Sequence, residues 1–67
     1  MNGMFKDILD SVRESYKPQF DKLSNKVLET KSSKERTKSL VKASIAWHAN
    51  DFDKAIEILT NYLKEQQ

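Results

Sequence analysis

The chain has 67 residues, of which 37% are hydrophobic and 33% are charged, and it contains no cysteine. This length leaves room for one small domain, and the lack of cysteine excludes disulfide bonds and thiolate metal sites. One glycine and one proline are too few for a sheet protein, which needs frequent turns, so we expect an all-α fold over residues 1–67. The net charge of +2 is unevenly distributed, because residues 31–42 alone carry a net charge of +4.

The sequence shows no feature of a membrane or secreted protein. Its longest apolar runs are only a few residues, too short to span a bilayer. The start, Met1–Asp7, does not have an apolar core behind a basic leader. We therefore expect an intracellular, cytoplasmic protein with no membrane span.

The first predicted helix covers about residues 4–30. Pro18 lies inside it and removes one backbone donor, so we expect the helix to be kinked or broken near this residue. A full break would give four helices instead of three. The long apolar stripe could also pair with a second copy, which makes a homodimer through this helix one interpretation. The stripe repeats at the spacings of one helix face and keeps its phase across the proline: Phe5, Leu9, Val12, Tyr16, Phe20, Leu23 and Val27.

Two further helices are predicted, over about residues 33–48 and 52–64. Ser32 and Glu35 have the spacing of a capping box at the start of the second helix. Asn50 tolerates the left-handed conformation that ends a helix, and Asp51 is a suitable cap for the third helix. The elements predict a small three-helix bundle that ends in an antiparallel hairpin. One face of the third helix is apolar: Phe52, Ala55, Ile56, Leu59, Tyr62 and Leu63.

The segment His48–Glu57, with Asn50, Phe52 and the pair Ala55-Ile56, resembles the turn of a tetratricopeptide repeat. Asn50 stands at the turn position where that family usually has glycine, and Phe52 stands at its aromatic position. The resemblance implies a repeat-like hairpin over residues 39–67. Its small and large apolar positions are matched by three residues: Ala43, Ala55 and Leu59.

The chain also departs from the repeat pattern. Lys42 stands where the family has leucine, Ala46 where it has an aromatic residue, and Tyr62 where it has alanine. A single repeat cannot bury its own apolar face. We therefore expect the N-terminal helix to cover the hairpin. The resemblance places four residues near the family's ligand-facing surface: Leu40, Ser44, Trp47 and His48.

The second helix is apolar on two sides. Leu40, Ala43 and Trp47 lie on one side, and Val41 and Ile45 lie nearly opposite. Two interpretations follow. Either the N-terminal helix covers Val41 and Ile45, or this pair stays exposed and binds another protein.

A strip of lysines flanks Val41 and Ile45. Lys31, Lys34, Lys38 and Lys42 follow one another at helical spacings. The strip is typical of a solvated helix face, but it could also attract an acidic protein or the phosphates of nucleic acid. Nucleic acid is the weaker alternative, because no aromatic residue lies among the lysines to stack on bases.

The sequence favours a non-enzymatic protein-binding module that serves as an adaptor, an assembly subunit or a small regulator. It offers no glycine-rich loop or nucleophile–base pair, and we expect no cofactor and no metal. Trp47 is suited either to the core or to an interface. His48 either interacts with the helix end or joins the interface. The expected partner has an acidic or mixed surface, and the predicted partner-binding residues are Lys34, Lys38, Val41, Lys42, Ile45, Trp47 and His48.

Overall fold

A computed structural model describes residues 2–66, with side chains from Phe5 onward. Met1 and Gln67, the two ends of the expected domain, lie outside the described residues. The described chain forms three helices: α1 (Asn2–Glu29), α2 (Lys34–His48) and α3 (Phe52–Glu65). The predicted all-α bundle is confirmed, with three helices and no strand over residues 2–66.

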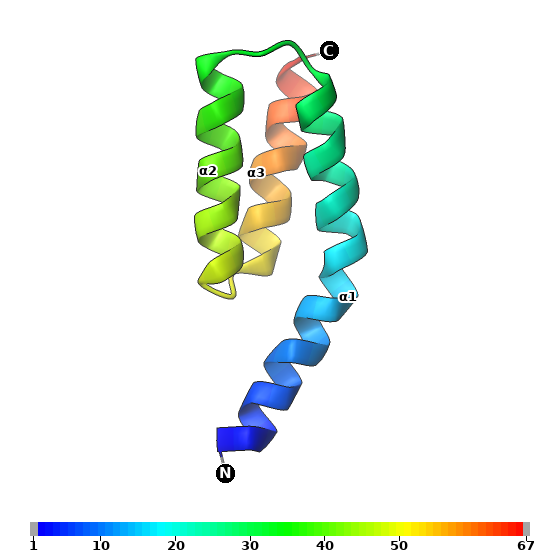
Figure 1. Ribbon diagram of the computed structural model, residues 1–67, viewed down its shortest axis with the longest axis vertical. Coiled ribbons are helices and arrows are strands. Elements are labelled where there is room, and N and C mark those ends of the chain that lie inside the picture. The colour runs from blue at the N-terminus through cyan, green and yellow to red at the C-terminus, as the bar shows by residue number, and fades with distance from the viewer. Residues whose placement is uncertain (1, 67) are drawn as a thin grey trace.

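The three helices pack around α3. Figure 1 shows α2 and α3 side by side and antiparallel, with the second half of α1 on the other side of α3. Helices α1 and α2 contact each other much less than either contacts α3. The core residues come from all three helices, with Val27 from α1, Ala43 from α2, and Leu59 and Tyr62 from α3. Because every other helix packs on α3, its predicted apolar face is the one most fully buried.

Helix α1 is continuous through Pro18 but bends. The first half of α1 turns away from the other two helices and extends beyond the α2–α3 turn (Figure 1). Proline lacks the N–H that would bond to the carbonyl of Glu14, and its ring crowds that carbonyl, which accounts for a bend one turn before Pro18. Of the two alternatives, the structure has the kinked helix. We call residues 5–16 the arm.

The link between α1 and α2 differs in one detail from the sequence prediction. The N-cap of α2 is Ser33 rather than Ser32, and its Oγ accepts a hydrogen bond from the backbone N–H of Arg36 at 3.1 Å. The capping box of Ser32 and Glu35 was therefore wrong by one residue. The Arg36 side chain also stabilises this link. Its guanidinium donates to the carbonyls of Leu28 and Thr30, which have no hydrogen-bond partner within α1.

The turn between α2 and α3 is closed by Asn50. This residue has a φ of 65°, the left-handed conformation predicted for it. The N–H of Asn50 donates to the carbonyl of Trp47, and the N–H of Asp51 donates to the carbonyl of Ala46. This pair of bonds is the Schellman arrangement, usually built with glycine, and it satisfies the last carbonyls of α2. Asp51 is the N-cap residue of α3, but its side chain makes no capping hydrogen bond.

Candidate partner-binding face

The outward face of α2 combines apolar and basic residues. Val41 is 51% exposed and Ile45 is 65% exposed, so the N-terminal helix does not cover them. Lys34, Lys38 and Lys42 are also exposed. Because α1 packs on α3 instead, this side of α2 faces solvent along its length. Of the two interpretations for Val41 and Ile45, the structure agrees with the one in which this pair stays exposed.

Trp47 lies on the other side of α2 and is part of the interior. Its ring stacks on Phe20 of α1 with centroids 4.4 Å apart, and it meets Phe52 of α3 edge to face at 4.9 Å. Tyr16 stacks on Phe52 in turn, at 5.8 Å. This row of aromatic rings joins all three helices, so Trp47 is separated from Val41 and Ile45.

The other residues that the sequence placed near the binding surface lie partly on the exposed side of α2 and partly on its packed side. His48 is exposed at the C-terminal end of α2, one helical turn from Ile45. Leu40 is partly buried and packs against the core. Since Trp47 stacks on Phe20, α1 occupies part of the surface that the repeat resemblance would make ligand-facing.

A shallow groove runs between α2 and α3 beside Ile45. It has a volume of ≈ 320 Å³. Its apolar lining consists of Ile45, Ala46 and Ala49 on the α2 side and Ile58 on α3. Its charged lining is one lysine from each helix and an aspartate at the turn: Lys42, Lys54 and Asp51.

The sequence reasoning missed the α3 side of this groove. Ile58 does not belong to the main apolar stripe of α3, and it is partly exposed. The sequence did offer one indication of this role, because Ile58 lies one helical turn after Lys54 and Ala55 and so lies on the same side of α3 as they do. When a helix packs against two neighbours, an apolar residue beside its main stripe extends the apolar surface toward one of those neighbours.

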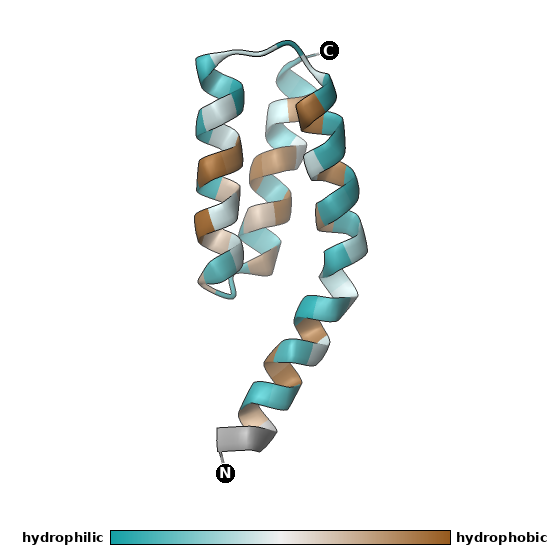
Figure 2. Ribbon diagram, viewed as in Figure 1, coloured by the Kyte–Doolittle hydropathy of each residue, from teal (hydrophilic) through white to brown (hydrophobic). Residues whose placement is uncertain are grey.

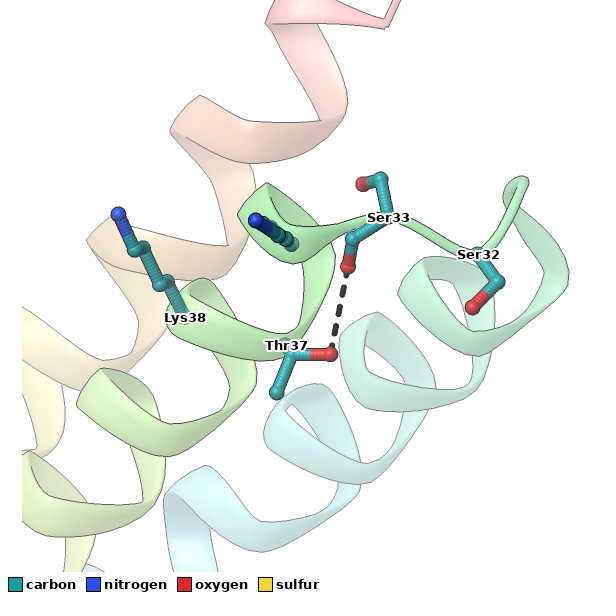
Figure 3. A pocket seen from close by; sticks show the side chains of 5 residues that line it. Ser32, Ser33, Thr37 and Lys38 are labelled. Atoms are coloured by element: carbon teal, nitrogen blue, oxygen red, sulfur yellow. Dashed lines mark hydrogen bonds between the residues drawn. The ribbon is translucent and has the colours of Figure 1, made fainter.

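The N-terminal end of α2 forms a second hollow, shown in Figure 3. It is lined by Ser32, Ser33, Lys34, Thr37 and Lys38. Two of its hydroxyls already have partners in the chain, because Ser33 Oγ caps the helix and Thr37 Oγ1 donates to the Ser33 carbonyl at 3.3 Å. The Lys38 side chain extends away from the Ser32–Ser33 segment (Figure 3). The hollow is therefore a capped helix end beside the lysine strip.

The arm carries a third apolar surface. Phe5 is 67% exposed and Ile8 is 57% exposed, and Figure 2 shows apolar bands on the part of α1 that extends beyond the other helices. The last turn of the arm is attached to the α2–α3 turn. Arg13 donates to the Asn50 side chain and lies over the Phe52 ring, and Tyr16 Oη donates to Asp53 at 2.6 Å. This hydrogen bond and the negative charge of Asp53 raise the pKa of Tyr16 above its usual value.

Comparisons of the chain with protein-family models, with curated proteins and with solved structures give no match. No helix within residues 2–66 is long and apolar enough to cross a membrane.

Proposed function

We propose that this chain is a non-enzymatic protein-binding module that acts as an adaptor, an assembly subunit or a small regulator. It binds its partner through the outward face of α2, and the partner has an acidic or mixed surface. The observation that carries the proposal is the exposure of Val41 and Ile45 among lysines, on a helix whose other side is packed. Exposed aliphatic residues grouped with one sign of charge are typical of interaction surfaces.

The repeat-like hairpin is part of the same proposal. Ala43 and Ala55 are buried between closely packed helices, as the small positions of such repeats are, which supports this relation. In this interpretation the chain has a single hairpin, and α1 packs where the next repeat would lie in an array.

A nucleic-acid-binding accessory role is the alternative, and it rests on the exposed strip of Lys31, Lys34, Lys38 and Lys42. Two features weigh against it. The lysines alternate with the apolar pair, and Trp47 and Phe20 stack on each other instead of being free to stack on bases. A homodimer through the arm is a further alternative, which rests on the exposure of Phe5 and Ile8.

One capture experiment separates these functions. The wild-type protein, a Val41→Ser/Ile45→Ser variant and a Phe5→Ser/Ile8→Ser variant are immobilised and exposed to extract of the native host. We expect the α2 variant to lose the captured protein and the arm variant to retain it. Equal recovery on wild type and the α2 variant would contradict the proposal.

The alternatives have their own readouts. A labelled DNA duplex tests the nucleic-acid role, since binding through phosphates would weaken by orders of magnitude between low and moderate salt. Sedimentation at several protein concentrations tests the homodimer, and the Phe5→Ser/Ile8→Ser variant serves as its monomeric control.

A further inference from the structure

The groove between α2 and α3 has a defined shape and charge pattern. Its two isoleucines, Ile45 and Ile58, come from two antiparallel helices, and its other apolar lining residues are the small Ala46 and Ala49. Its volume is ≈ 320 Å³, whereas an engineered cavity of roughly 150 Å³ holds a benzene ring. The groove therefore has room for about two side chains of that size from a single partner element.

The charges bordering the groove are arranged on both sides of it. Lys42 lies on the α2 side and Lys54 on the α3 side. On α2 the basic character continues away from the turn through Lys38 and Lys34, about 6 and 12 Å from Lys42 at the rise of an α-helix. On α3 Lys54 is the one lysine lining the groove, and the exposed Glu57 and Glu65 follow it along the helix. A partner element that fits has an apolar stripe, a row of carboxylates on the flank that faces α2, and a carboxylate opposite Lys54 on the other flank.

We propose that this groove holds one acidic amphipathic helix of a partner protein, laid along α2 and α3 with its N-terminus over Asp51. This inference rests on the proposed function and names the element that the α2 face recognises. A helix lying in an apolar groove is a common mode of peptide recognition.

The orientation follows from the charge at the two ends of the groove. A helix N-terminus carries a partial positive charge and a helix C-terminus carries a partial negative charge. Asp51 lies at the turn, and the lysine strip extends toward the opposite end of α2. The bound helix therefore runs antiparallel to α2 and parallel to α3.

The charge pattern disfavours the chain's own arm as the occupant. Lys6 and Arg13 lie three residues before and four residues after Leu9, so both flank this residue at the edge of the arm's apolar stripe. In the groove of a second copy they would lie toward Lys42 or Lys54. The acidic residues of the arm lie on the side away from its stripe: Asp7, Asp10 and Glu14.

A synthetic helix tests the proposal. The probe is a peptide with leucines on one face and glutamates on both flanks, and its control has lysines in place of the glutamates. We expect titration calorimetry at low salt to give binding at least about tenfold tighter for the acidic peptide. The double variant Lys42→Glu/Lys54→Glu should abolish this preference, and the matched variant Lys17→Glu/Lys22→Glu, on α1, should keep it. Equal affinity for the two peptides, or binding of neither, would overturn the proposal.

The orientation is read from the same complex. A nitroxide is attached through a disulfide to a cysteine at the N-terminus of the peptide, and it cannot exchange onto the protein, which has no cysteine. It should broaden the amide resonances of Ala49 and Asp51 more than that of Lys38. The opposite pattern, or equal broadening at both ends, overturns the orientation. If the peptide fails but Val41→Ser/Ile45→Ser still releases the captured partner, the proposed function stands without the helix-in-groove mode.

Discussion

The two halves of α1 have the same apolar stripe but different surroundings. In the second half Val27 is buried and Phe20 and Leu23 pack against the core, whereas in the first half Phe5, Ile8 and Val12 are exposed. The cause is length. Helix α1 has 28 residues and α3 has 14, which at the rise of an α-helix are about 42 and 21 Å long. A periodic stripe thus predicts a helix, but burial requires a neighbour of matching length.

The largest expected effect is in the core around α3. Replacing Leu59, which is fully buried, with alanine should cost about 2–5 kcal/mol of unfolding free energy. Leu28→Ala, at an exposed leucine, should stay within about 0.5 kcal/mol. Thermal unfolding by circular dichroism measures both. Similar losses for the two variants would mean that the protein does not depend on packing around α3.

A matched pair on the stripe of α1 tests the comparison itself. Phe20→Ala removes the ring that stacks on Trp47 and should cost about 2–3 kcal/mol, because this side chain is only partly buried. Phe5→Ala should leave the unfolding free energy within about 0.5 kcal/mol of wild type. If Phe5→Ala were as costly as Phe20→Ala, the arm would have to be packed in solution.

The start of α2 offers a smaller and position-specific effect. Ser33→Ala removes the side chain that accepts from Arg36 N and should cost about 1 kcal/mol. Ser32→Ala should be nearly neutral, because Ser32 lies before the cap. Urea unfolding of the two variants distinguishes these positions. A larger loss for Ser32→Ala would restore the capping box expected from the sequence.

The smallest effect concerns the contact between the arm and α3. In a Tyr62→Phe background, absorbance of the tyrosinate reports Tyr16 alone, and its pKa should lie above the ordinary value of 10.0. Adding Asp53→Asn should lower this pKa toward the ordinary value, since Asp53 supplies both the hydrogen bond and the charge.

This contact has a defined pH window. Because the folded protein holds the tyrosine proton more tightly than the unfolded chain does, the contact stabilises the protein below the ordinary pKa and is lost as the pH rises through the folded value. An unchanged Tyr16 pKa after Asp53→Asn would show that the hydrogen bond between Tyr16 and Asp53 does not form in solution.

The sequence predicts local structure here better than it predicts neighbours. Helical periodicity and turn chemistry predict three helices and the left-handed Asn50, because these depend on a few adjacent residues. Periodicity alone does not say which helix is central. The exposure of Val41 and Ile45 and the stacking of Trp47 on Phe20 depend on where α1 packs, which no local pattern predicts. The position of Ile58 beside Ile45 depends on how α2 and α3 pair.

Thermal unfolding of Val41→Ser/Ile45→Ser tests the central claim most directly, because a binding face should not be needed for folding. Serine and valine have similar helix propensities, so the substitution mainly removes apolar surface. We predict a Tm within about 4 °C of wild type, equivalent to less than about 1 kcal/mol in a domain of this size. A fall of more than about 10 °C would show that these side chains hold the bundle together, and the α2 face would then belong to the core.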